Sequence, residues 1–133
     1  MEAGSPASPR LPRDRRIRHG RDFQRAKSQG KRLAQGCLVL NWIPINAGSI
    51  SRLGVITSRA VGGAVVRSRA RRLLRECFRI HQPRLAQPVD VVLVARPSIA
   101  GRSLGEVQAD FLAALRRAGL LNEPKAGAGT SQS

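Results

Sequence analysis

Residues 62–79 read GGAVVRSRARRLLRECFR, and this stretch combines a helical pattern with six arginines and one glutamate. At 100° per residue, one side of the predicted helix is apolar and the other is cationic. The apolar side consists of Val66, Ala70, Leu73, Leu74, Cys77 and Ile80. The cationic side consists of Arg67, Arg71, Arg72, Arg75 and Arg79, with Ser68 among them. The pattern predicts a helix that packs on a core and presents its arginines outward.

Four of these arginines follow one another at a spacing of four residues: Arg67, Arg71, Arg75 and Arg79. Like charges at this spacing repel by a few tenths of a kcal/mol per pair, roughly, so a solvated helix normally alternates the sign of its charges. The register therefore predicts an anionic ligand on this face.

The whole chain also carries an excess of positive charge. Its 133 residues include 24 Lys and Arg against 8 Asp and Glu, a formal net charge of +16, and 21 of the 24 cations are arginine. The 41% hydrophobic content is enough for one domain with a modest core. Because arginine grips phosphate with two parallel hydrogen bonds and stacks on bases, nucleic acid is the polyanion that this composition favours.

Membrane insertion and secretion are not indicated. No apolar run reaches the roughly 18 residues of a membrane span, and the first residues lack the apolar stretch of a secretory signal. Cys37 and Cys77 lie in apolar patterns without metal-type spacing, which predicts two reduced core thiols in a cytoplasmic protein.

The predicted organisation is one RNA-binding domain, 13–121, between disordered tails at 1–12 and 122–133, which are rich in Pro, Gly, Ser and Ala. The first predicted elements, in chain order, are a helix at 20–29, an extended segment at 31–45 and a strand at 52–58. The basic helix follows and ends at Pro83, and a buried strand follows at 89–95. Ser103 and Glu106 then begin a last helix as a capping box, and Gly119 ends it. We expect the strand 52–58 to pair with 31–45 through the loop between them. The order predicts a mixed α+β sandwich with helices against one sheet.

Residues 52–79, RLGVITSRAVGGAVVRSRARRLLRECFR, resemble the protein subunit of bacterial ribonuclease P. The family pattern is a strand ending Arg-Leu-Gly-hydrophobic, a Gly-Ala-Val turn, and an Arg-Asn-Arg helix finishing in Arg-Glu. Supporting matches are Asp22-Phe23-Gln24 with Gly30, and Asp90-Val91-Val92 through Ala95-Arg96. The similarity spans residues 11–121 in the family's order.

This resemblance implies a compact αβββαβα two-layer sandwich with a left-handed β-α-β crossover, the ribosomal protein S5 domain 2-like fold, against the usual right-handed preference. It also implies a function. In the family an RNA subunit catalyses endonucleolytic removal of the 5′ leader from precursor tRNA, and one protein binds that RNA, contacts the leader and improves the use of Mg²⁺. The Mg²⁺ is expected to be held mainly by the RNA.

The resemblance assigns RNA-binding residues one by one. Arg67-Ser68-Arg69 stands at the Arg-Asn-Arg signature, with serine in place of asparagine, which removes the amide's paired donor and acceptor. The other matched basic positions are Arg71, Arg72 and Arg75 on the helix, and Arg59 before the turn, where a second basic residue is replaced by Ala60.

In the family the leader lies in a cleft between the first helix and one sheet face. Phe23 matches the first aromatic residue of that cleft, Lys27 stands where a second is common, and Val39 and Asn41 face the cleft from the strand, Asn41 in place of a frequent tyrosine. With fewer stacking positions, leader binding is expected to depend on Lys27, Arg25 and hydrogen bonds from Asn41. Taken without the resemblance, Phe23 is simply a core anchor of its short helix, and Asn41 is ordinary surface.

No catalytic or metal-binding residues are expected in the chain itself. Its eight acidic residues are scattered, and His19 and His81 are isolated in the sequence. A basic arm provides general attraction to RNA: Arg10, Arg13, Arg15, Arg16, Arg18 and Arg21. The main alternative is a ribosomal or ribosome-assembly protein. A DNA-binding module is disfavoured because a base-reading helix mixes Asn, Gln and Ser with arginine.

Overall fold

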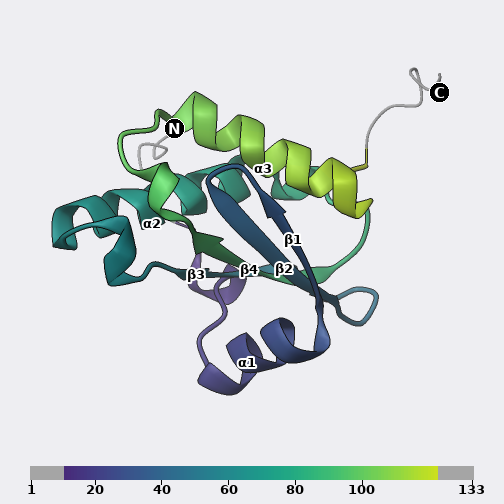
Figure 1. Cartoon of the computed structure of the whole chain (residues 1–133). Helices are drawn as coiled ribbons and strands as arrows, with labels where there is room; N and C mark the ends of the chain where they lie inside the picture. Colours follow the sequence, from purple (N-terminus) through teal and green to yellow (C-terminus); the bar gives the residue numbers. More distant parts are fainter. Residues whose placement is uncertain (1–10, 123–133) are drawn as a thin grey trace, which may run out of the picture.

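The computed structural model describes residues 11–122, and its helices and strands follow the predicted αβββαβα order (Figure 1). The elements are α1 (Gly20–Gln29), β1 (Lys31–Gln35), β2 (Leu38–Pro44), β3 (Arg52–Ile56), α2 (Ala64–His81), β4 (Val89–Ala95) and α3 (Leu104–Ala118). The capping box that was predicted at the start of the last helix is present, with Ser103 and Glu106 bonded reciprocally, and Gly119 ends that helix in the left-handed conformation.

The four strands form one sheet in the order β1-β2-β4-β3. The β1–β2 and β2–β4 pairs are antiparallel, whereas β3 runs parallel to β4, with α2 as the crossover between them. The expected pairing of 52–58 with 31–45 is therefore wrong. The almost entirely apolar β4 takes the place beside β2 because a strand that is apolar on both sides is best buried at the centre of the sheet.

The predicted extended segment 31–45 is divided by a tight turn into β1 and β2. Gly36 has a φ of 54° there, a left-handed conformation that favours glycine, and a β-carbon at this position would collide with the carboxylate of Asp110. That carboxylate, from α3, accepts a hydrogen bond from the Cys37 backbone N–H at 2.9 Å. The last helix thus fixes the hairpin turn.

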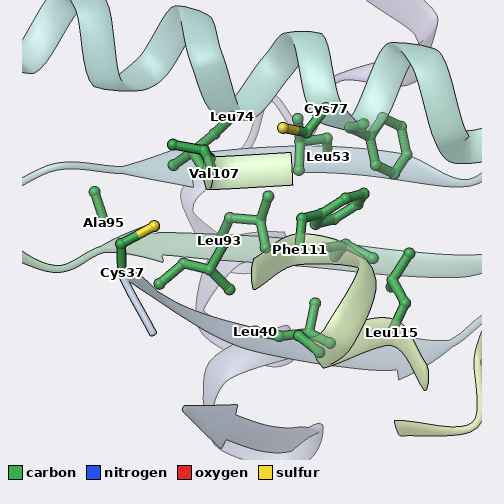
Figure 2. Close-up of a cluster of buried hydrophobic side chains, with 14 of the residues drawn as sticks. Cys37, Leu40, Leu53, Leu74, Cys77, Leu93, Ala95, Val107, Phe111 and Leu115 are labelled. Atoms are coloured by element: carbon green, nitrogen blue, oxygen red, sulfur yellow. The ribbon is translucent and has the colours of Figure 1, made fainter. Parts of the chain in front are cut away.

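The main core lies between one sheet face and the two long helices α2 and α3, while α1 lies against the opposite face (Figure 1). Figure 2 shows where side chains from both helices meet the sheet. The labelled residues there are Cys37, Leu40, Leu53, Leu74, Cys77, Leu93, Ala95, Val107, Phe111 and Leu115. Both cysteines are free and buried, as predicted, and Trp42 also lies in this core.

The buried side of α2 is rotated from the predicted one. The helix buries Ala70, Leu74, Cys77, Phe78 and His81. Val66 and Ile80, which were expected on the apolar side, are 36% and 39% exposed. Phe78 replaces them because its large ring fills the core more completely than a side chain at the margin of the apolar arc.

The folded chain extends slightly beyond the predicted domain limits. Leu11 is buried in the main core, and the Asn122 backbone N–H donates to the Arg84 carbonyl at 2.6 Å. Leu11 and Asn122, just outside the predicted limits of 13 and 121, thus make contacts with the fold, and the rest of both predicted tails lies outside the described residues. No helix within 11–122 is long and apolar enough to cross a membrane.

Candidate nucleic-acid interface

The segment before α1 passes around the outer edge of β3. Leu11 lies in the main core, whereas Ile17 belongs to the small apolar cluster under α1 on the other face of the sheet. Between them, Arg16 pairs in parallel with Leu53 of β3, and the Ile17 N–H donates to the Leu53 carbonyl at 2.9 Å. This path places Arg16 at the edge where the two faces of the sheet meet.

Two α2 arginines lie near Arg16. Arg71 donates to the Thr57 hydroxyl at 2.8 Å, just beyond the end of β3, and to the Ser68 hydroxyl at 3.2 Å. Burial, and then the charges of Arg16 and Arg71, lower the pKa of Arg75, so the Arg75 guanidinium lies within electrostatic reach of both. We call Arg16, Arg71 and Arg75 the β3-side strip.

The β3-side strip contains no neutralising carboxylate among the residues that the structure describes. The ion pairs in that part of the chain involve Arg25, Arg52 and Arg79, not the strip. Arg67, earlier on the same helix, has a buried Nε without a hydrogen-bond partner within 11–122. A group of arginines held together without counter-charge is what an anion-binding surface requires.

A second pair of arginines lies on the other side of α2. Arg69 donates to the backbone carbonyl of Arg102, just before α3, at 2.8 Å. Arg69 and Arg72 line a shallow hollow of about 310 Å³ together with Ala64, Val65 and Ser68. Val65 is 84% exposed there, beside the two cations. We call Arg69 and Arg72 the α3-side flank.

Arg79 differs from the other arginines of the predicted register. It binds the Glu76 carboxylate through two hydrogen bonds, at 3.1 and 2.6 Å, and this contact lowers the pKa of Glu76. Its charge is therefore neutralised within the helix. The unpaired register that was predicted over four arginines ends at Arg75.

Of the four residues expected to form the leader cleft, two lie on α1 and two on β2. Phe23 is partly buried, and its ring lies over Gly54 of β3, while Lys27 is exposed on the same helix. Val39 is 8% exposed and Asn41 only 2%, and the Asn41 side-chain amide donates to the Val92 carbonyl at 3.3 Å. Phe23 is thus partly accessible and Lys27 exposed, whereas Val39 and Asn41 are nearly covered on β2, which β4 separates from the strand under the Phe23 ring.

A polar network that the sequence did not reveal fastens α1 to this face. Asp90 of β4 is fully buried and accepts two hydrogen bonds from Arg52 of β3, at 3.0 and 2.7 Å. Two α1 side chains join them: Arg25 lies 3.7 Å from Asp90, and Asp22 lies 3.6 Å from Arg52. An aspartate inside an apolar strand was the available signal, since a buried carboxylate needs a cation close by.

The remaining titratable groups do not gather into a reactive centre. Within residues 11–122, no three His, Cys, Asp or Glu side chains lie together as a metal site requires. His81 is buried with its ring 6.4 Å from that of Phe111, and His19 is exposed before α1. The chemistry that these surfaces support is the binding of a polyanion.

Comparisons with known proteins agree on one family. The family model described as Ribonuclease P matches residues 11–119. A relative from Roseiflexus sp. (strain RS-1), named Ribonuclease P protein component, is 36% identical over 118 residues, which are 88% of this chain and 96% of the relative. One from Syntrophomonas wolfei, with the same name, is 36% identical over 110 residues, 83% of this chain and 92% of that protein.

Solved structures of similar proteins share the fold. The Staphylococcus aureus RNase P protein superimposes with a TM-score of 0.72 at 26% identity, covering 81% of this chain and 98% of that one. The Thermotoga maritima RNase P protein gives a TM-score of 0.68 at 28% identity, covering 77% of this chain and 96% of that one. The sheet and helices described above are therefore those of this group of structures.

Proposed function

The chain belongs to the ribonuclease P protein family, and from this membership we propose that it binds the RNA of ribonuclease P and the 5′ leader of precursor tRNA. In this function the protein assists endonucleolytic removal of the leader, which forms the mature 5′ end of the tRNA. The observation that supports RNA binding most directly is the β3-side strip, where three arginines lie together without a carboxylate partner among the described residues.

The proposed RNA-binding surface is the exposed side of α2 and the turn before it. Its members share a position on or near that helix: Arg59, Arg67, Ser68, Arg69, Arg71, Arg72 and Arg75. The guanidinium groups of the arginines would bind backbone phosphates, a contact that does not depend on the base sequence. The Ser68 hydroxyl has a second role in this proposal, because it already accepts a hydrogen bond from Arg71 and so orients that side chain.

The proposed leader site is the α1 face. There the ring of Phe23 would stack on a base of the leader, a contact worth about 1–3 kcal/mol, and Lys27 would bind a phosphate. Val39 and Asn41 would act from beneath, since both side chains are nearly covered and the Asn41 amide is already bonded to Val92. Arg25, which is on the same helix as Lys27 and lies 3.7 Å from Asp90, would add a further positive charge.

Catalysis is assigned to the RNA subunit in this proposal. The protein would supply cations and shape, and the activated water for phosphodiester cleavage would come from Mg²⁺ held mainly by the RNA. One protein would act with one RNA in the bacterial cytoplasm. The free thiols of Cys37 and Cys77 fit a reducing compartment.

The test is cleavage of a 5′-extended precursor tRNA at low Mg²⁺ by ribonuclease P RNA from the same organism, with and without this protein. We expect the protein to stimulate cleavage at the correct 5′ end, and the protein alone to cut nothing. No stimulation, together with co-sedimentation of the protein with ribosomal particles, would overturn the proposal in favour of a ribosomal role. Cleavage by the protein alone would overturn the assignment of catalysis to the RNA.

A further inference from the structure

Two arginines of α2 are held on opposite sides of the helix. Arg71 is held at the end of β3 through Thr57, whereas Arg69 is held on the opposite side of the helix by the carbonyl of Arg102. The sequence pattern predicted that all of the cations of α2 lie on one face of the helix. In the structure Arg71 and Arg69 are held toward different neighbours of the helix, and Ser68 lies between them, because it bonds Arg71 and also lines the α3-side hollow.

The β3-side strip is continuous with the α1 face. Strand β3 is an outer strand of the sheet, and the segment that passes around its edge joins the core at Leu11 to the α1 cluster at Ile17. Arg16 lies on that edge, and the ring of Phe23 lies over Gly54 of the same strand. An RNA strand that leaves the α1 face across β3 therefore meets Arg16 first and Arg71 and Arg75 next.

The α3-side flank has a different chemical character. Its hollow combines the cations of Arg69 and Arg72 with the apolar side chains of Ala64 and Val65, and Val65 is almost fully exposed. Apolar groups beside cations suit the sugars and base faces of a folded RNA as well as its phosphates. Arg69 of this flank is held just before α3, on the side of α2 away from Thr57 and β3.

We propose that α2 holds two RNA molecules at once: the β3-side strip binds the precursor tRNA where it leaves the α1 face, and the α3-side flank binds the ribonuclease P RNA. This inference rests on the proposed function, because the leader must lie on the α1 face. It adds that the helix joins substrate to catalyst. The protein then raises substrate affinity without taking part in the chemical step.

Binding measurements on the holoenzyme separate the two surfaces. We expect Arg71→Ala with Arg75→Ala to weaken precursor tRNA binding by roughly tenfold or more, and to change the affinity of the protein for ribonuclease P RNA by less than about twofold. Arg69→Ala with Arg72→Ala should do the reverse. Arg79→Ala is the matched control, because its charge is already neutralised by Glu76, and should change neither affinity.

Arg16→Ala provides a second variant that leaves α2 intact. Within residues 11–122 the hydrogen bond of the Arg16 side chain is the one to the Leu11 carbonyl, so its loss should disturb the fold little. It should weaken precursor tRNA binding and spare ribonuclease P RNA binding. Unfolding curves for every variant would establish that the affinities refer to folded protein.

Tethered cleavage locates each RNA directly. Cys37 and Cys77 are fully buried, so an iron chelate can be attached to one new thiol, either Ser58→Cys beside Thr57 or Val65→Cys in the α3-side hollow. Both native residues are exposed, and neither is a proposed cation. In the holoenzyme with substrate bound, we expect the tether at 58 to cut precursor tRNA near its 5′ end and the tether at 65 to cut ribonuclease P RNA.

The outcomes distinguish this inference from the proposed function. If both tethers cut only ribonuclease P RNA, and both double variants weaken its binding equally, the division of α2 is wrong while the proposed function stands. If the unaltered protein binds neither RNA, the proposed function itself fails. Selective loss of one RNA by each double variant, with the matching cleavage pattern, would establish the division.

Discussion

The ring of Phe23 in α1 occupies the space above Gly54 in β3. A β-carbon at Gly54 would lie 2.7 Å from Cζ of that ring, and closer still to Cε1. The glycine therefore sets how near α1 lies to the sheet, and the position of the proposed stacking ring depends on a residue from another element.

Gly54→Ala should push the ring away from the strand. We expect the substitution to destabilise the protein by about 1–3 kcal/mol, as overpacking does, and to weaken binding of leader-bearing tRNA. Denaturant unfolding and tRNA affinity measure the two effects. Adding Phe23→Ala should relieve the strain, so the cost of Gly54→Ala should be much smaller in that background.

A matched glycine supplies the control for this prediction. A β-carbon at Gly105, in the first turn of α3, would meet only the Ser103 hydroxyl at 3.9 Å. Gly105→Ala should therefore stabilise the protein by up to about 1 kcal/mol, the difference in helix propensity. Equal effects at positions 54 and 105 would contradict the role given to the Phe23 ring.

The Asp90 network predicts an order of stability losses. Arg52→Met leaves the fully buried Asp90 carboxylate with only Arg25, 3.7 Å away, and should cost about 3–5 kcal/mol. Asp90→Asn should cost less, about 1–3 kcal/mol, because Arg52 is partly exposed and can turn to water. Asp22→Asn, which removes a 3.6 Å contact at the surface, should cost about 0–1 kcal/mol. Urea unfolding would reveal any other order.

The two thiols predict a loss of stability in alkali. Burial raises the pKa of Cys37 and of Cys77 from 9.0 to about 12. The pKa of each thiol is higher in the folded than in the unfolded protein. The contribution of the thiols to folding stability is therefore complete below pH 9. It is lost as the pH rises toward about 12, because only the unfolded thiols ionise in that range. The free energy of unfolding should therefore fall above pH 9.

Thiol labelling checks the same burial at neutral pH. An aromatic disulfide reagent should react with neither cysteine of the folded protein, and with both once denaturant unfolds it. The pH-dependent loss should shrink in a Cys37→Ala and Cys77→Ala variant that still folds. Rapid labelling of the native protein would show that the thiols are accessible.

The cationic surface predicts a salt-dependent affinity. If about six phosphates are engaged, the logarithm of the affinity for precursor tRNA should fall with the logarithm of salt concentration at a slope of about −4 to −5. Arg67→Ala with Arg71→Ala should weaken binding and flatten the slope by about one to two. Arg79→Ala should leave it unchanged, since Glu76 already neutralises that charge. If the double variant shows the unaltered slope, Arg67 and Arg71 do not belong to the RNA-binding surface.

Local patterns predicted the helices and strands well because each element depends on residues that are close together in the sequence. Ser103 with Glu106 begins α3, the apolar run of β4 becomes a central strand, and the arginine pattern becomes α2. Strand neighbours depend on contacts between distant residues instead. No local feature of β3 distinguishes pairing with β2 from pairing with β4, and the prediction for that strand was wrong for this reason.

The candidate site shows the same limit. The residue types of the α2 surface and of the α1 face follow from the sequence, but their surroundings do not. The neutralisation of Arg79 by Glu76, the covering of Asn41 and the network around Asp90 each depend on where a second side chain lies. Spacing alone presented Arg79 as a free cation and Asn41 as ordinary surface, and the family resemblance presented Asn41 as a contact of the leader.

The path of the first described residues around β3 also affects how the protein behaves without RNA. Outer strands of an open sheet can recruit a strand from another molecule, which leads to aggregation. Here the Ile17 N–H closes part of the β3 edge, and on β1 the Arg117 guanidinium donates to the Ala34 carbonyl at 3.1 Å. The Ile17 backbone and the Arg117 side chain thus oppose edge-to-edge association of the protein before it binds RNA.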